Sequence, residues 1–515
     1  MSTYTYKQVA KNPGIVTNLP TDSVFFSTGR NVRIRPGAIY KSPGQSEFVG
    51  ASQGFPVRAL FNFKGYDNVW RTIACCDTKI YSYTTDFATV FNATPSTPPS
   101  STLTDVWQFA LVGGMPVLSN GVNPPWKWSN FAAVMTPLAN APTICKALHT
   151  HMNRVVAGNI QEGAYDFPSR VRWSNIAQAE DWAKDLKGSS GAKDLINPSS
   201  SLNGVDAIKA ITHIGNKLIV FTDRNIWFGD ATPESIDYIW ASLDRGVGLV
   251  APRAFVRSIS GILYFMGETD FYSYTEDKGL RPIGFDIQNS CFPNLNKNAI
   301  STAFCYDRPA TKEIVFCVAT GTNTTPDTAF VYQEEVKAWT IEDCAYNARV
   351  VALTDANFTW DTLPFGSWDT ITDGRWDLMS NTGILPYEVG ANSDGKIFKL
   401  EYGSNKIDGT GIDGYLETGD MVFGNAMMNK ITDEIIPYLK MQADVSALMV
   451  QVGTRDSLHK DIDWSLPFPY TVGVSRHVNA RKQGKYIRLR FYSNVANSPW
   501  VLEGYQIKFQ GGGSR

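Results

Sequence analysis

The segment 210–228, AITHIGNKLIVFTDRNIWF, contains three short strand-like runs joined by tight turns. Gly215 lies in the first turn, Asp223-Arg224-Asn225 forms the second, and the last run ends in aromatic residues. The segment 255–274, FVRSISGILYFMGETDFYSY, repeats the same order of strands and turns. Paired units of this kind predict small antiparallel sheets.

The aromatic strand ending recurs along the chain. Its copies are Ile80–Tyr83, Trp126–Ser129, Val171–Ser174, Asn225–Phe228, Phe271–Tyr274, Lys337–Thr340 and Lys396–Lys399. Their intervals cluster at roughly 45 to 65 residues, which is the length of one propeller blade. We therefore predict an all-β protein in which residues 46–400 form an irregular β-propeller-like body with loop insertions, of about six or seven blades.

The two ends of the chain differ from this repeat. Residues 1–45 look extended and contain turn signals such as Asn12-Pro13-Gly14. A turn-rich stretch at 408–414 precedes longer strands, and 485–491 (KYIRLRF) alternates polar with apolar residues, which predicts one buried and one basic face. We predict that residues 401–515 form a β-sandwich-like platform and that strands from residues 1–45 join it.

Charge follows the same division. Residues 1–50 hold six basic and two acidic side chains, and residues 430–515 hold twelve basic and seven acidic ones. The rest of the chain holds 29 basic and 40 acidic side chains, an excess of 11 negative charges. Either this split is a chance fluctuation or it separates an acidic body from two basic ends.

Composition is that of a globular protein, with 43% hydrophobic and 19% charged residues. The seven cysteines are odd in number and show no C-x-x-C spacing, which argues against a disulfide framework and a zinc knuckle. The first residues lack the apolar region of a signal peptide, and no apolar run reaches about 18 residues. We expect no membrane span and synthesis in a cytoplasm. One short helix is expected at 175–182, after Ser174 as N-cap.

Motifs that carry chemistry are mostly missing. G-x-S-x-G, Walker and H-E-x-x-H patterns do not occur. His149 and His151 share one face of a strand, where metal ligation is conceivable but a surface strand is the interpretation we favour. The nearest approach to a sialidase Asp-box, 367–376, has the wrong spacing. We therefore predict no catalytic residues, no metal site and no cofactor.

Two further patterns leave alternatives open. Trp360, Trp368 and Trp376 are each followed by aspartate, so they form either a sugar-stacking platform or an aromatic clamp on a long excursion from a blade. The second pattern is a set of arginines with aromatic neighbours that resembles a single-strand nucleic-acid surface, or else solvated strand faces. These arginines are Arg33, Arg35, Arg488 and Arg490.

Three stretches together resemble the tail-nozzle proteins of short-tailed bacteriophages, the family of tubular tail and packaged-DNA stabilisation proteins. The first is 12–44, with NPGIVTNLP, GRNVR and GAIYKSPG. The second is LIVFTDRNIW at 218–227, followed by GVG at 246–248 and GILYFMG at 261–267. The third is GKYIRLRF at 484–491 with Trp500 and Gly504.

The resemblance implies a structural protein of the virion tail that is made in the cytoplasm of a bacterial host. Members form a homo-oligomer, a hexameric ring, below the portal and the head-to-tail adaptor ring, carry tail fibres or spikes, and let duplex DNA pass through the lumen without sequence readout. The resemblance carries no active site, so it implies no enzyme. An acidic lumen would repel the phosphate backbone and keep the duplex sliding, and we hypothesise that the acidic body supplies it. The alternative function is a propeller-type glycan-binding or glycan-hydrolysing tail protein.

Overall fold

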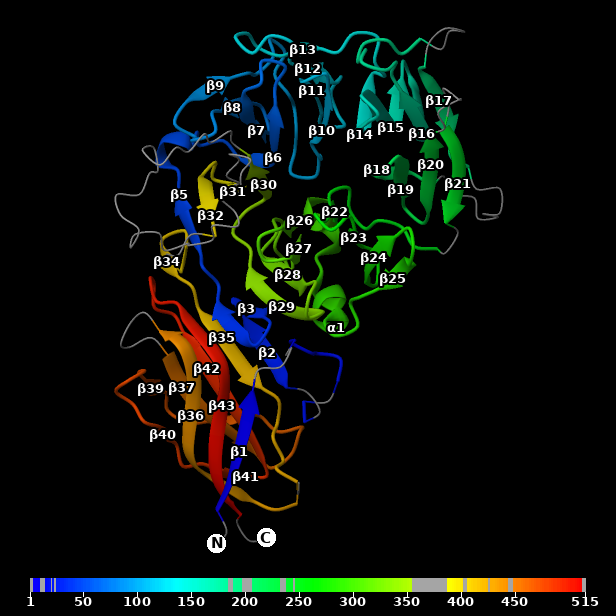
Figure 1. The fold of residues 1–515 in the computed structure, drawn as a ribbon. Coiled ribbons are helices and arrows are strands. Elements are labelled where there is room, and N and C mark those ends of the chain that lie inside the picture. The colour runs from blue at the N-terminus through cyan, green and yellow to red at the C-terminus, as the bar shows by residue number, and fades with distance from the viewer. Residues whose placement is uncertain are drawn as a thin grey trace.

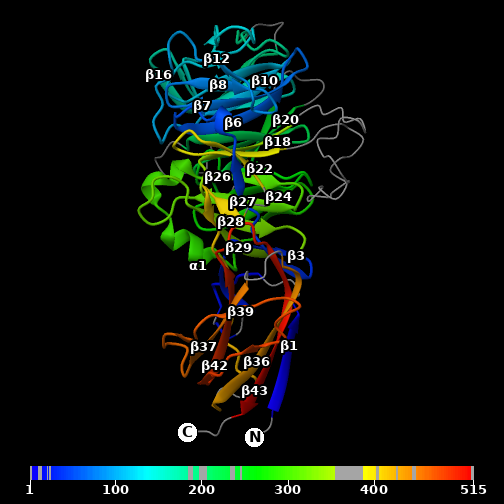
Figure 2. The ribbon, with the colours of Figure 1, turned by 90° about the vertical axis from the view of Figure 1, so that its left-hand side faces the viewer.

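The computed structural model describes residues 3–9, 14–19, 21–22, 25–183, 189–196, 206–231, 238–243, 246–353, 387–401, 405–424, 427–442 and 448–511. It shows an elongated molecule with a β-propeller at one end and a β-sandwich at the other (Figure 1). Both chain termini lie at the far end of the sandwich (Figures 1 and 2). The prediction of an all-β propeller with a platform built from both chain ends is confirmed.

The propeller has seven four-stranded blades, each built from antiparallel neighbours. Blades 1 and 2 are β6 (Val57–Lys64), β7 (Trp70–Cys76), β8 (Ile80–Tyr83) and β9 (Val90–Asn92), then β10 (Gln108–Val112), β11 (Met115–Ser119), β12 (Trp126–Lys127) and β13 (Thr136–Pro137). Blades 3 and 4 are β14 (Ile144–His151), β15 (Arg154–Glu162), β16 (Tyr165–Trp173) and β17 (Gly191–Asp194), then β18 (Ile208–Ile214), β19 (Lys217–Thr222), β20 (Ile226–Ala231) and β21 (Tyr238–Leu243). Blades 5 and 6 are β22 (Phe255–Arg257), β23 (Leu263–Met266), β24 (Phe271–Thr275) and β25 (Gly279–Pro282), then β26 (Phe304–Arg308), β27 (Glu313–Val318), β28 (Thr328–Gln333) and β29 (Ala338–Asp343).

An N-terminal strand closes the ring. Blade 7 contains β30 (Ala348–Ala352), β31 (Tyr387–Ala391) and β32 (Ile397–Leu400), and its outer strand is β5 (Gln45–Glu47). Glu47 pairs with Phe398 and Gln45 with Leu400, so residues from opposite ends of the propeller sequence share one blade. The chain thus runs from the outer strand of blade 7 into β6, the inner strand of blade 1, and this connection ties the last blade to the first.

The sandwich consists of two sheets that share a core of apolar side chains. One sheet contains β3 (Val32–Arg35), β4 (Ala38–Lys41), β43 (Trp500–Gly511), β36 (Lys430–Gln442), β40 (Val478–Asn479), β1 (Thr3–Val9) and β41 (Gln483–Gly484). The other contains β2 (Phe26–Arg30), β35 (Gly414–Thr418), β42 (Tyr486–Ser493), β37 (Leu448–Arg455), β38 (Asp463–Trp464) and β39 (Phe468–Tyr470). A small hairpin, β33 (Lys406–Ile407) with β34 (Thr410–Gly411), precedes β35. Ile487, Leu489 and Phe491 are fully buried, as the alternating sequence of β42 predicts.

The helix expected at 175–182 is wrong. The backbone turns here instead, and Ala177 has a positive φ of 59°, which an α-helix does not accept. Asn175 organises the turn, because its Oδ1 accepts a hydrogen bond from the backbone N–H of Ser190 (2.8 Å) and its Nδ2 donates to Asp181. Among the described residues the helical elements are α1 (Gln288–Cys291) and three 3-10 turns, η1 (Val49–Ala51), η2 (Phe292–Asn294) and η3 (Lys297–Thr302).

None of the helices in the described part of the chain is both long and apolar enough to cross a membrane.

Candidate functional site

The sequence predicts no catalytic or metal site. Within the described ranges, no group of three or more His, Cys, Asp or Glu side chains is placed to hold a metal ion. The tryptophans at 360, 368 and 376, and the stretch 367–376, lie outside the described residues.

His149 and His151 do lie on one strand, β14, but the surface-strand interpretation is wrong. His151 is only 3% exposed, and its Nδ1 lies 2.8 Å from the hydroxyl of Tyr238. His149 Nε2 lies 2.8 Å from Nδ1 of His213 on the neighbouring blade. Burial and the other histidines lower the pKa of His149 to about 3 and that of His151 to about 4. The pair is therefore neutral at physiological pH and acts as packing between blades 3 and 4.

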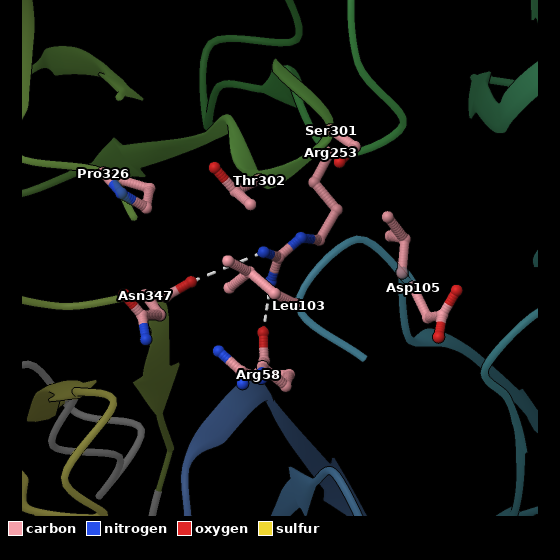
Figure 3. Close-up of a pocket in the computed structure, with 9 residues that line it drawn as sticks. Arg58, Leu103, Asp105, Arg253, Ser301, Thr302, Pro326 and Asn347 are labelled. Atoms are coloured by element: carbon pink, nitrogen blue, oxygen red, sulfur yellow. Dashed lines mark hydrogen bonds between the residues drawn. The ribbon is translucent and has the colours of Figure 1, made fainter. Parts of the chain in front are cut away.

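Arg253 lies in a small cavity close to the points where the inner strands of several blades begin (Figure 3). Its Nη1 donates to the carbonyl of Arg58 on β6 (2.7 Å), and its Nη2 lies 3.4 Å from the carbonyl of Asn347, just before β30. The guanidinium also lies over the ring of Phe304, 5.5 Å from its centroid. The cavity around these groups has a volume of about 10 Å³, which is room for one water molecule.

Arg253 is a buried cation without a described carboxylate partner. Burial and the nearby Arg58 lower its pKa to about 10, so it stays charged at neutral pH. Arg58 itself is neutralised by Asp77, with Nε and Oδ1 2.7 Å apart. Backbone carbonyls of Arg58 in blade 1 and of Asn347 just before blade 7 therefore hold the guanidinium close to the points where these inner strands begin.

The junction between propeller and sandwich contains a buried ionic cluster, which we call the junction cluster. Its members are Arg33, Arg308, Arg349, Glu313, Glu342, Glu388 and Glu401. Arg33 on β3 donates from Nε to Glu342 on β29 (2.6 Å) and from Nη2 to Glu401 after β32 (2.9 Å). A single arginine of the sandwich thus binds carboxylates from blades 6 and 7.

Arg308 on β26 completes the bridge from the propeller side. Its Nη2 donates to the second oxygen of Glu342 (2.6 Å), and its Nη1 donates to Glu313 (3.0 Å). Burial opposes ionisation of Glu342 and Glu401, but the arginines outweigh it and hold both pKa values below the usual range, at about 2 for Glu401. Buried carboxylates that remain ionised in this way require every partner to stay in place.

The arginines that resembled a nucleic-acid surface are engaged within the protein. Arg33 is in the junction cluster, and Arg488 pairs with Glu417 (3.3 Å) and Asp420 (2.8 Å) inside the sandwich. Arg490 lies over the ring of Trp464, 4.3 Å from its centroid, and pairs with Glu417 at 2.5 Å. Arg35 lies over Tyr40 at 4.8 Å. The prediction of a basic face on β42 is therefore wrong, since acidic residues of β35 and the following turn neutralise it.

Sequence reasoning missed the junction cluster. The alternation of Arg33 and Arg35 was visible, but the partner carboxylates lie about 300 residues away and no local pattern marks them. Only the folded topology brings these strands together.

No protein-family model matches the chain, and the search of curated proteins gives no match. Over 62% of its length the chain is similar to the extracellular domain of a hybrid two-component system from B. thetaiotaomicron, with 12% identity and a TM-score of 0.35, and it covers 39% of the solved chain of that domain. It is also similar to the WD40 domain of Pan2 from Neurospora crassa, with 9% identity, a TM-score of 0.38 and coverage of 71% of this chain and 95% of that one. Similarities this distant carry no argument about function.

Proposed function

We propose that the protein is a structural component of a short-tailed phage tail, a nozzle subunit that forms a ring and conducts DNA, and that it works without catalysis. One observation carries the proposal beside the sequence resemblance. The N-terminal segment makes the propeller and the platform a single connected body, as the wall of a pressurised tube requires.

This connection runs along the outer strand of blade 6. The backbone N–H of Ile15 donates to Trp339 (2.9 Å), and that of Asn31 donates to Ile341 (2.8 Å). In the other direction, the backbone N–H of Asp343 donates to Oδ1 of Asn31 (2.7 Å), and the carboxylate of Asp343 forms an ion pair with Arg30. The free edge of β29 is thus covered by N-terminal residues, and the next N-terminal strands enter the sandwich and then close blade 7.

In this proposal the duplex passes between subunits and not along a propeller axis. The acidic excess of residues 51–429 is the candidate lining of the shared lumen, because like charge prevents tight phosphate binding. The basic chain ends then serve contacts with neighbouring rings.

Electron microscopy and sedimentation of the purified full-length chain test the proposal. We expect closed rings with a central channel, and weak duplex binding that changes little between low and physiological salt. Monomers at micromolar concentration that hydrolyse a host polysaccharide would instead establish the glycan-hydrolysing alternative. Rings that bind duplex DNA tightly at low salt and release it as salt rises would support ring assembly but contradict the acidic lumen.

A further inference from the structure

A second cavity lies at the ends of the inner strands, away from the strand starts where Arg253 sits. This cavity of about 520 Å³ lies where the inner strands of blades 4 to 7 end, and we call it the axial mouth. Its apolar lining includes Ile214, Ile259, Val351 and Leu353, and its charged lining includes Arg257 and Asp307. A cavity of this size accommodates several side chains of a bound segment.

One wall of the axial mouth is a tight turn whose backbone is held by hydrogen bonds. The turn 258–261 joins β22 to β23, with Gly261 at a φ of 82° and its N–H bonded to the carbonyl of Ser258 (2.9 Å). Asp307 on β26 accepts a hydrogen bond from the N–H of Ile259 (2.9 Å). The turn therefore does not depend on a ligand for its shape.

This turn presents an apolar side chain to solvent. Ile259 is 79% exposed although its backbone is held rigidly, and it stands on the rim beside the half-buried Ile214. A rigid exposed aliphatic group at a cavity is a preorganised contact, because binding it costs little conformational entropy. It provides the apolar half of a recognition site.

The acidic half comes from blade 6. Asp307 lines the cavity, and Glu334 lies nearby, 3.3 Å from the hydroxyl of Ser260 on the same turn. Within the described chain neither carboxylate forms an ion pair. Arg257 is on the blade 5 side of the mouth, where its Nη1 lies 3.4 Å from the carbonyl of His213.

We propose that the axial mouth binds a peptide segment of a partner protein, one that presents a lysine or arginine next to an apolar side chain. The cation pairs with Asp307 and Glu334, and the apolar neighbour packs on Ile259 and the aliphatic wall formed by Ile214 and Val351. A cation entering here gains a charge-assisted hydrogen bond with carboxylates that form no ion pair with any described residue. The site does not depend on ring formation, so it stands apart from the nozzle proposal.

Saturation-transfer NMR on the full-length protein tests this with three acetylated, amidated pentapeptides: Gly-Leu-Arg-Leu-Gly, Gly-Leu-Glu-Leu-Gly and Gly-Gly-Arg-Gly-Gly. We expect the leucine–arginine peptide to bind at least about fivefold more tightly than either of the others. Asp307→Asn keeps an acceptor for the N–H of Ile259 but removes the charge, and should weaken binding about tenfold. Glu334→Gln should weaken it too, and Ile259→Ser should lower transfer to the leucine methyl groups.

The matched control is Glu503→Gln, which removes an exposed carboxylate from the distant sandwich and should leave binding unchanged. Circular dichroism of each variant establishes that it is folded. Equal binding of the arginine and glutamate peptides would overturn the proposal. So would binding that survives both the Asp307→Asn and the Glu334→Gln substitution in folded protein.

Discussion

Arg33 of the sandwich and Glu342 of the propeller form a buried ion pair, with Nε and Oε1 2.6 Å apart. The two side chains are 4% and 6% exposed. Glu342 also binds Arg308 through its other oxygen, so one carboxylate joins β3 of the sandwich to β26, the innermost strand of blade 6. The junction cluster therefore stabilises the protein only while each of its charged side chains has an oppositely charged partner. A buried charge that loses its partner is destabilising, because it is also cut off from water.

Replacing Arg33 by methionine should destabilise the protein strongly. The change leaves Glu342 and Glu401 without one of their cations, and breaking a buried pair from one side costs roughly 3–5 kcal/mol. The free energy of unfolding from urea titration measures the effect. Lys312→Met is the control, since Lys312 and Glu335 form an ion pair whose side chains are 55% and 42% accessible, and solvent screens such an exposed pair. If Arg33→Met and Lys312→Met lower the free energy of unfolding equally, the junction cluster does not hold the propeller and the sandwich together.

Mild acid should weaken the contact between blades 3 and 4. The pKa of His149 is lowered from 6.5 to about 3 in the folded protein, mainly by burial and then by His213. Between these values the unfolded chain binds one more proton than the folded chain, so stability falls as pH falls from 6.5 towards 3. Each such histidine contributes about 1.4 kcal/mol per pH unit within its window.

The measurement is the slope of unfolding free energy between pH 6.5 and pH 5, where unperturbed carboxylates remain ionised. His149→Gln keeps a polar atom near His213 but does not titrate, so its slope should be shallower by about one proton. Arg257 faces His149 and His213, and Arg154 faces His151, which adds to the cost of protonation. An unchanged slope in His149→Gln would mean that this imidazole is protonated or exposed at neutral pH.

The fold was largely predictable because its signals are local. The strand-turn-strand pattern of 210–228 and 255–274 corresponds to β18–β20 and β22–β24, and the alternation in 485–491 corresponds to β42. The turn at 175–182 was mistaken for a helix because Ser174 looks like an N-cap, whereas tertiary hydrogen bonds from Asn175 decide its shape. The local sequence does not predict that Gln45–Glu47 closes the ring, because three polar residues are equally compatible with a loop and with a strand.

Sites were less predictable than strands, because their residues converge from distant positions. The sequence shows Arg33 as half of a basic alternation, and its true role appears only when Glu342 and Glu401 are beside it. The axial mouth combines residues from four blades, so neither Asp307 nor Ile259 stands out alone. His149 and His151 were correctly placed on one strand face, but which face is buried depends on the neighbouring blade.

Gly248 should not tolerate even a methyl group. A Cβ at this position would lie 2.0 Å from the carbonyl oxygen of Asp223, in the turn between β19 and β20. We expect Gly248→Ala to cost roughly 1–3 kcal/mol or more, as overpacking does. Gly50→Ala is the control, because a Cβ there meets no atom within 4 Å and should change stability by less than about 0.5 kcal/mol. Thermal and urea unfolding of both variants measure the difference, and a neutral Gly248→Ala would mean that this close approach is not kept in solution.

All seven cysteines are free thiols, and the structure predicts that they are unreactive in the native state. Burial raises the pKa of most of them, to about 12 for Cys76 and Cys145. Since the thiolate is the nucleophile, alkylation at pH 8 should be at least about tenfold slower in the folded protein than in denaturant at Cys75, Cys76, Cys145, Cys291, Cys305 and Cys317, whose pKa values burial raises. Mass spectrometry after timed iodoacetamide treatment measures each site, and Cys305 is the most informative because it is half-buried while the others are buried.

A native-state rate at Cys305 equal to that in denaturant would contradict the packing of β26 against blade 5. Labelling of fewer than seven thiols in denaturant without reductant would reveal a disulfide that the fold does not contain.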